Sequence, residues 1–143
     1  MSHRPISEII AGRKLVVAKP GMSVREAARL MKREAVGAVL VVEDDRLRGI
    51  FTERDALNRV LAEGLSPDDT QLAAVMTADP ITVEDSRAIG YALHLMHENS
   101  FRHVPVTHAG KAIGMVSVRD ALGPEMVEFE HELERREELT EIL

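Results

Sequence analysis

Two short motifs carry residue types that could bind a phosphorylated ligand. Thr52 and Asp55 stand three residues apart with Arg54 between them, and the same pattern recurs at Ser117 and Asp120. A hydroxyl at the start of a helix with an acid three residues later fits a capping box. The same geometry offers the backbone N–H groups and the partial positive charge of a helix start to a phosphate. It also offers an acid that can accept hydrogen bonds from the two hydroxyls of a ribose. The pattern allows a helix cap, a nucleotide contact, or both.

The two motifs belong to an internal duplication. Residues 49–57 (GIFTERDAL) resemble residues 114–122 (GMVSVRDAL), at an offset of 65 positions. The register continues without a gap across residues 16–57, and most mismatches are conservative. Arg54 therefore corresponds to Arg119, and an arginine beside the acid can pair with phosphate. We conclude that one structural unit is written twice in the chain.

Each copy follows a β-α-β-β-α pattern. Apolar residues at helical spacing begin at Val24 and at Ile89, which predicts an amphipathic helix in each copy. Two strand-like runs joined by a polar turn follow each helix, over 38–42 and 47–51 in the first copy and over 103–107 and 112–116 in the second. A second helix is expected to start at Thr52 and at Ser117. Because each copy is too small to bury a large core, the copies are predicted to pack as a pseudo-twofold α/β module with a cleft between them.

The predicted boundaries follow the duplication. The first repeat is expected over residues 1–65, the second over 66–123, and a C-terminal acidic helix over 124–143. The last segment has no glycine or proline after Pro124 and is rich in Glu, Leu and Arg, which favours a helix. Three apolar residues share one face of it: Met126, Phe129 and Leu133. Two interpretations are equally weighted: a helix folded back on its own body, or a partner-binding or dimerising helix.

Composition narrows the function. The net charge is −6, but residues 124–143 hold eight glutamates against two arginines, so the two repeats together are neutral. A basic surface for duplex DNA is therefore not expected, and with 3% aromatic residues there is little for base stacking. With no cysteine, disulfides, thiol nucleophiles and cysteine zinc sites are excluded. No signal peptide or apolar run of membrane-spanning length is evident, so the expected location is the cytoplasm, away from membranes.

Other chemistry is weakly represented. His94 and His97 lie three residues apart with Glu98 beside the second, but no further zinc ligand is evident, so surface histidines are the better interpretation. The chain contains no Gly-x-x-x-x-Gly-Lys and no Gly-x-Gly-x-x-Gly motif, and no arrangement typical of an activated nucleophile. A catalytic role, a metal site and a catalytic cofactor are not expected.

On these motifs the sequence resembles a tandem CBS-domain pair, also called a Bateman module, in a stand-alone CBS-domain-containing protein. The repeated Gly-h-h-Thr/Ser-x-x-Asp pattern (h, hydrophobic) at Gly49 and Gly114 is similar to the family motif. Residues 76–83 resemble the usual opening of a repeat, and residues 101–106 resemble its central strand. The resemblance covers about residues 5–123.

The resemblance implies a non-catalytic regulatory module. Such pairs bind adenosine-containing ligands (AMP, ADP, ATP, S-adenosylmethionine or NAD) in clefts between the repeats, and they commonly form disk-like homodimers. The acid of one repeat holds the ribose, and the strands of the other shape the adenine pocket. With no catalytic, channel or transporter domain attached here, the regulated effector is expected to be a separate protein.

Carried over by position, the resemblance implies two sites with different residues. One would combine Thr52, Arg54 and Asp55 with Thr82, Phe101, Arg102 and His103. The other would combine Ser117, Arg119 and Asp120 with Val17, Val36 and Gly37. Because only the first of these groups includes Arg102 and His103, the Asp55 site is predicted to bind phosphate better.

Two alternatives compete with the sensor. A ligand-independent dimerisation scaffold would use the Thr/Ser-x-x-Asp motifs only as helix caps. Arg54 and Arg119 argue against that, because capping does not require them. A small metal-dependent hydrolase lacks a visible set of catalytic residues.

Overall fold

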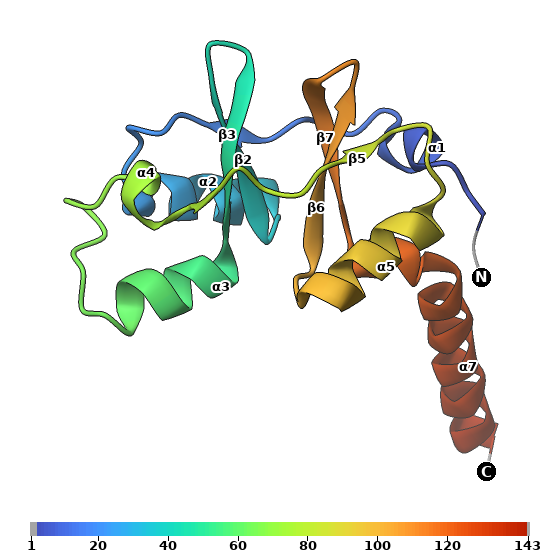
Figure 1. Ribbon diagram of the computed structural model, residues 1–143. Coiled ribbons are helices and arrows are strands. Elements are labelled where there is room, and N and C mark those ends of the chain that lie inside the picture. The colour runs from blue at the N-terminus through green and yellow to red at the C-terminus, as the bar shows by residue number, and fades with distance from the viewer. Residues whose placement is uncertain (1–2, 143) are drawn as a thin grey trace.

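Two half-modules of the same plan lie side by side in the computed structural model (Figure 1). The structure describes residues 3–142, except for the side chains of residues 124–130 and 141–142. The elements of the first half are β1 (Val17–Ala18), α2 (Val24–Glu34), β2 (Ala38–Glu43), β3 (Arg46–Thr52), α3 (Glu53–Asp55) and the π-helical segment η1 (Ala56–Leu61). Those of the second are β5 (Val83–Glu84), α5 (Ile89–Asn99), β6 (His103–His108), β7 (Lys111–Ser117) and α6 (Val118–Ala121). The predicted mixed α/β fold with two repeats is confirmed.

Each half is built on a small mixed sheet. The short first strand pairs in parallel with the central strand, β1 with β2 and β5 with β6. The central strand then pairs antiparallel with the third, β2 with β3 and β6 with β7, as the predicted hairpins require. Both hairpins shift register at the same place, after Val41 and after Val106. The two repeats therefore share even the position of a β-bulge in the hairpin.

The two halves exchange their first helices. The helix α1 (Ile6–Ile10) packs in the second core with α5 and β6, although it belongs to the first repeat in sequence. The helix α4 (Leu72–Val75) packs in the first core, although it belongs to the second repeat in sequence. A cut between residues 65 and 66 therefore separates the repeats in sequence but not the packed cores. The sequence analysis did not foresee these two helices or their exchange.

The exchange follows the pseudo-twofold relation of the repeats. An isolated antiparallel bridge joins Pro5 to Ala88, and its counterpart joins Ser23 to Gln71. After α4, the strand β4 (Thr77–Ala78) adds to the edge of β3. Ile6 and Leu72 are both fully buried, each in the core of the other repeat. Since burying such a side chain contributes about 1.5–3 kcal/mol, each half depends on the other for part of its stability.

A third apolar cluster joins the halves directly. Ala38, Leu40 and Ile50 are buried at this junction, and Ala112 and Met115 of the second half pack against them. The two sheets meet here through β3 and β7. This contact fixes the two Thr/Ser-x-x-Asp motifs relative to each other, because each motif begins at the end of one of these strands.

The glycine that opens each motif makes room for the exchanged segment of the other half. A methyl group at Gly49 would lie 2.6 Å from Sδ of Met76 and 2.8 Å from the carbonyl oxygen of Thr77. At Gly114 the nearest atom would be Cδ1 of Ile10, at 3.0 Å. The motif glycine is therefore required by close packing at the junction, because a side chain there would push the crossing segment away.

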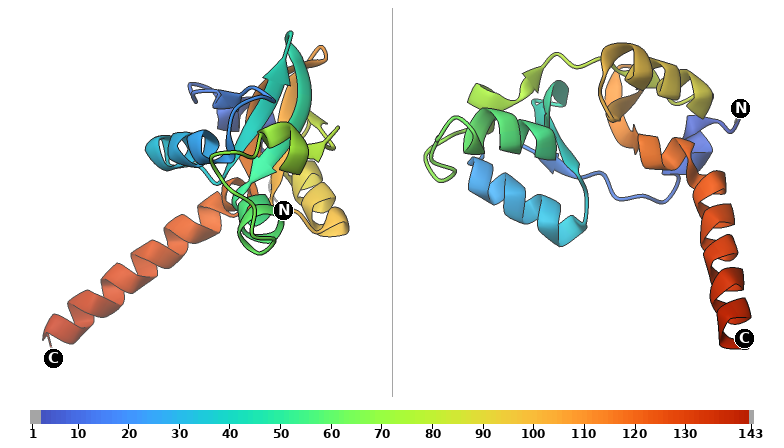
Figure 2. Two further views of the ribbon diagram at one scale, coloured as in Figure 1. Left: turned by 90° about the vertical axis from the view of Figure 1, so that its left-hand side faces the viewer. Right: turned by 90° about the horizontal axis from the view of Figure 1, so that it is seen from below.

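The helix α7 (Gly123–Ile142) projects from the body (Figure 2). Its side chains from residue 131 to residue 140 are exposed. Two interpretations of this helix were left open by the sequence: folding back on its own body, or binding a partner or a second copy. The structure does not show the helix folded back on the body (Figure 2). The predicted apolar positions Met126 and Phe129 lie outside the described side chains. In the described part of the chain, no helix is both long enough and apolar enough to cross a bilayer.

We expect Gly49→Ala to destabilise the protein by about 1–3 kcal/mol, the usual range for overpacking, because a backbone oxygen blocks the new methyl group. Gly114→Ala should cost less, since its closest contact is 3.0 Å and the three nearest atoms all belong to the Ile10 side chain, with no backbone atom among them. Gly21→Ala is the matched control, because nothing lies within 4 Å of its Cβ position. Urea unfolding measures all three, and a Gly49→Ala protein as stable as Gly21→Ala would contradict this account of the junction.

Candidate ligand-binding cleft

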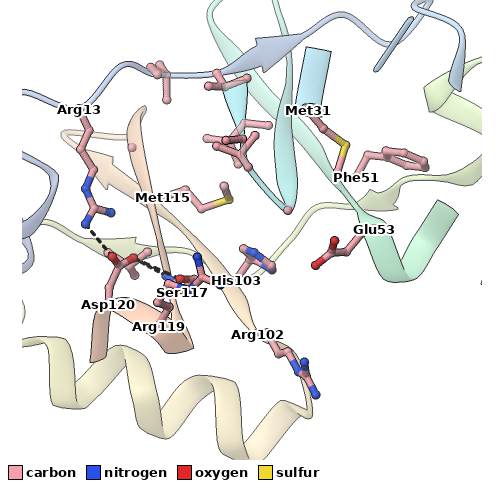
Figure 3. A pocket seen from close by; sticks show the side chains of 18 of the residues that line it. Arg13, Met31, Phe51, Glu53, Arg102, His103, Met115, Ser117, Arg119 and Asp120 are labelled. Carbon is pink, nitrogen blue, oxygen red and sulfur yellow. Dashed lines mark hydrogen bonds and ion pairs between the residues drawn. The ribbon is translucent and has the colours of Figure 1, made fainter. Parts of the chain in front are cut away.

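A cleft of about 1060 Å³ lies between the two halves (Figure 3). One wall is the chain between α1 and β1 together with the end of α2. The opposite wall is the end of β7 and the short helix α6, with the start of β6 beside it. The Ser117–Asp120 motif therefore faces the first repeat across the cleft, as the pseudo-twofold packing predicts.

Ser117 and Asp120 hold each other at the start of α6. The backbone N–H of Ser117 donates to Oδ2 of Asp120 over 2.8 Å, and the Ser117 hydroxyl lies 3.4 Å from the same oxygen. The Asp120 side chain is 13% exposed. The acid predicted from the motif thus has its second oxygen, Oδ1, available to groups in the cleft.

Oδ1 is paired with Arg13, which comes from the crossing segment. Nη2 of Arg13 lies 2.6 Å from Oδ1 of Asp120. A second arginine of the N-terminal segment, Arg4, donates to the backbone carbonyl of Asp120 over 3.0 Å. Burial acts to raise the pKa of Asp120, but the hydrogen bonds from Arg13 and Ser117 hold it below its usual value. Asp120 is therefore a carboxylate at neutral pH.

Cationic side chains outnumber acidic ones in the described lining of the cleft. The five cations are Arg13, Lys14, Lys32, Arg102 and Arg119. The two acids are Glu53 and Asp120. One of the cations, Lys14, is paired with Glu34 over 2.8 Å. A concave site with a cationic excess attracts anions, which agrees with a phosphorylated ligand.

His103 and Glu53 approach each other in the middle of the cleft. A methyl group at Gly37 would lie 3.0 Å from Oε1 of Glu53 and 3.3 Å from Nε2 of His103. Gly37 therefore leaves room for both side chains. Burial lowers the pKa of His103, and this effect outweighs the charges of Glu53 and Asp120, which act to raise it. His103 is thus neutral at neutral pH and able to accept as well as donate a hydrogen bond.

The structure groups the predicted residues differently from the sequence. Seven of them line this one cleft: Val36, Gly37, Arg102, His103, Ser117, Arg119 and Asp120. The other six lie outside it: Val17, Thr52, Arg54, Asp55, Thr82 and Phe101. Arg102 and His103 were expected beside Asp55, and the structure places them beside Asp120. The reason given for ranking the Asp55 site higher therefore applies to the Asp120 site instead.

The Asp55 motif is closed by contacts within the protein. Thr52 and Asp55 form a complete capping box, with bonds of 3.0 and 3.1 Å, and Asp55 is 8% exposed. Nε of Arg59 lies 3.6 Å from Oδ1 of Asp55, and the same guanidinium donates to the carbonyl oxygens of Val75 and Met76. Asp55 thus helps to hold the second crossing segment against the first half.

The remaining residues predicted for the Asp55 site are separated from it. Arg54 donates to the carbonyl oxygen of Ser100 over 3.3 Å, which links the two halves. Thr82 lines a smaller hollow of about 410 Å³ near the hairpin turns, together with the acids Asp45 and Asp79. Phe101 packs against the second core. His94 and His97 are exposed on α5, as expected of surface histidines.

Four charged lining residues were not predicted from the sequence: Arg13, Lys14, Lys32 and Glu53. The segment that contains Arg13 and Lys14 has no regular structure and carries no motif. Its place in the cleft follows from the exchange of α1, which carries the chain from the second core back to the first. The repeat offset of 65 positions relates one of these residues to the cleft. Glu53 corresponds by that offset to Val118, which also lines the cleft.

Comparison with known proteins agrees with this architecture. Residues 6–62 and 72–123 each match the family model of the CBS domain. A CBS domain-containing protein of Arabidopsis thaliana is 39% identical over 106 residues, which cover 73% of this chain. The chain spans 20% of the length of that relative.

Two solved structures are also similar. A candidate signal-transduction protein with CBS domains from Burkholderia ambifaria has a TM-score of 0.81 at 32% identity, over 87% of this chain and 95% of that one. A CBS domain protein from Pyrobaculum aerophilum, solved in complex with AMP, has a TM-score of 0.75 at 28% identity, over 82% of this chain and 89% of that one.

Two histidines provide a test of the cleft without any ligand. We expect the pKa of His103 to lie below the ordinary value of about 6.5 because of burial, and that of His108 above it because of its hydrogen bond to Asp85. Since folded His103 binds its proton less readily than the unfolded chain does, its contribution to stability falls as the pH drops below about 6.5. Histidine NMR titration measures both values, and the reverse order would contradict the burial of His103.

Proposed function

Because the chain belongs to the CBS domain family, with two CBS domains in tandem, we propose that it is a non-catalytic regulatory module for an adenosine-containing ligand. The ligand is AMP, ADP, ATP, S-adenosylmethionine or NAD, bound between the repeats, and its occupancy is passed to a separate partner protein. The observation that carries the proposal is the meeting of Asp120 with an excess of cationic side chains in one cleft. The relative from Pyrobaculum aerophilum, solved with AMP, supports it.

In this proposal the ligand lies between Asp120 and the start of the two central strands. Asp120 accepts hydrogen bonds from the ribose, and Ser117 adds a hydroxyl beside it. Arg102 and Arg119 pair with phosphate, as guanidinium groups do in a fork. Val36 and Gly37 form the wall for the adenine. The cleft volume of about 1060 Å³ is slightly above the range of about 300–1000 Å³ usual for ligand sites, so the cleft has room for a nucleotide.

A second site on the Asp55 side remains a weaker proposal. It would use Thr52, Arg54 and Asp55 with Thr82 and Phe101, whereas Val17 belongs by the sequence pattern to the Asp120 site. For a ligand to bind there, Arg54 would have to leave the carbonyl of Ser100. We therefore rank the Asp120 cleft first.

One observation favours a different function, a scaffold that needs no ligand. Both motif acids already have internal partners, Arg59 for Asp55 and Arg13 for Asp120. Under that function the motifs serve only to cap helices and to hold the crossing segments through these ion pairs. The cationic lining of the cleft argues against it, because neither capping nor the clasp requires Arg102 or Lys32 there.

A ligand panel separates the two functions. We expect an adenosine-containing ligand to raise the melting temperature, since a ligand at about 100 times its Kd adds about 2.7 kcal/mol of stability. Asp120→Asn should weaken binding at least about tenfold, the scale of one hydrogen bond to a charged group. Thermal shift followed by calorimetry measures both effects. Binding lost in Asp55→Asn and retained in Asp120→Asn would reverse our ranking, and no shift with any adenosyl compound would favour the scaffold.

We also propose that the protein is a homodimer, as the resemblance to paired CBS modules implies. Leu57 and Leu61 lie four residues apart on η1 and are 56% and 74% exposed. Apolar side chains this exposed and this close together are typical of a surface that another protein covers.

We expect Leu57→Glu with Leu61→Glu to convert the dimer to a monomer, because two buried charges would face each other across a twofold interface. Light scattering coupled to gel filtration measures the mass. The matched control is Leu139→Glu on α7, where the leucine is 59% exposed. Dissociation by Leu139→Glu instead would identify α7 as the dimer contact.

A further inference from the structure

Each oxygen of the carboxylate proposed to hold the ribose already accepts a hydrogen bond. Oδ1 of Asp120 is paired with Nη2 of Arg13 at 2.6 Å, and Oδ2 accepts the backbone N–H of Ser117 at 2.8 Å. A carboxylate oxygen can accept a second hydrogen bond, but the Asp120 side chain is only 13% exposed, so ribose hydroxyls compete with these donors for the space around it. The Ser117 bond is part of the start of α6, so its loss would disrupt the helix. Arg13 is therefore the donor that a ligand can replace.

Arg13 lies where its side chain can move, whereas Asp120 is held in place. Arg13 lies in the stretch between α1 and β1, which forms neither helix nor strand, and its side chain is 48% exposed. The Asp120 side chain is 13% exposed, and its backbone is held by Arg4. The neighbouring Lys14 is paired with Glu34. The two adjacent cations of this segment thus have different partners, and only Arg13 competes for the ribose site.

We propose that Arg13 makes the Asp120 cleft select phosphorylated adenosine ligands over uncharged or cationic ones. This inference rests on the proposed function. A ribose that takes Oδ1 leaves the Arg13 guanidinium without its anion, and a partly desolvated charge without a partner is unfavourable. A ligand phosphate in the same cleft supplies a new anion, so Arg13 exchanges one carboxylate for one phosphate. The ion pair lost is then replaced by an ion pair gained.

An uncharged ligand has no such replacement, because adenosine would break the Arg13–Asp120 pair and offer no anion to the guanidinium. S-adenosylmethionine has a carboxylate, but with its ammonium and sulfonium groups it brings a net positive charge into a cleft whose described lining holds five cations and two acids. Like charges at close range disfavour binding. Within the adenosyl class, the cleft is therefore selective for the phosphorylated members, AMP, ADP, ATP and NAD, with a residue of the crossing segment as the selecting group.

Calorimetry with ATP, AMP and adenosine on the wild-type chain and on Arg13→Gln tests the inference. The expected result is a fall of at least about tenfold in the ratio of ATP affinity to adenosine affinity, since one charge-assisted hydrogen bond is at stake. Both affinities contribute to that fall. ATP binds more weakly because its phosphate loses a cation, and adenosine binds more tightly because Asp120 is released.

Lys14→Gln is the matched control, because it removes the adjacent cation of the same cleft without freeing Asp120. Lys14→Gln should lower the affinity for ATP and leave the affinity for adenosine as in the wild type. Arg25 forms an exposed ion pair with Asp68 outside the cleft, so Arg25→Gln controls for the loss of such a pair. This variant should change neither the ATP affinity nor the adenosine affinity. Arg13→Lys keeps the charge and should retain most of the preference for ATP, so it also covers the case in which Arg13→Gln does not fold.

The outcomes separate the inference from the proposed function. If the wild type binds ATP but Arg13→Gln leaves the ratio unchanged, the exchange at Asp120 is overturned and nucleotide binding stands. If adenosine affinity falls in Arg13→Gln, Arg13 supports the ribose and does not compete with it, which also overturns the inference. If the wild type binds no adenosyl compound, the proposed function fails and the inference fails with it.

Discussion

The exchange of the first helices between the two repeats is the constraint on which the rest of the structure depends. Each repeat alone has a three-stranded sheet and two short helices, too little to enclose a core. Ile6 completes the core of the second half and Leu72 that of the first, and both are fully buried. The chain must then cross between the halves twice. The motif glycines Gly49 and Gly114 sit where these crossings pass the sheets, so their lack of a side chain is a packing requirement.

The same exchange breaks the symmetry that the duplication creates. Asp55 and Asp120 occupy equivalent places at the start of equivalent helices, and each accepts the backbone N–H three residues before it. Their counter-ions differ in origin. Asp55 is paired with Arg59, one turn along on its own helical segment, whereas Asp120 is paired with Arg13, which arrives on a crossing segment. A partner on the same helix is held by local geometry, and a partner on an irregular segment is free to exchange. Two equal motifs thereby acquire partners of unequal mobility, which is why we rank the Asp120 cleft first in the proposed function.

The sequence predicts local structure well here because the signals are local. Apolar spacing, polar turns and the offset of 65 positions specify the helices and hairpins, and the structure contains all of them. The grouping of site residues differs from the prediction because strand pairing within a repeat brings some of them together. Arg102 and His103 were expected beside Asp55, yet the β6–β7 hairpin of their own repeat pairs His103 with Ser117 and so places both residues beside Asp120. Arg13 carries no motif, and its position follows only from the crossing of the chain, a contact between residues 107 positions apart.

The link between the cleft and α7 is covalent and short. Asp120 lies in α6, three residues before Gly123, where α7 begins. Arg4 holds the carbonyl of Asp120, and its guanidinium lies 3.6 Å from the Cβ position of Gly123. A ligand changes the shape of a protein only when it binds two conformations with different affinity. An exchange in which Arg13 leaves Asp120 is a difference of that kind, because the paired and released states present different anions to the same guanidinium.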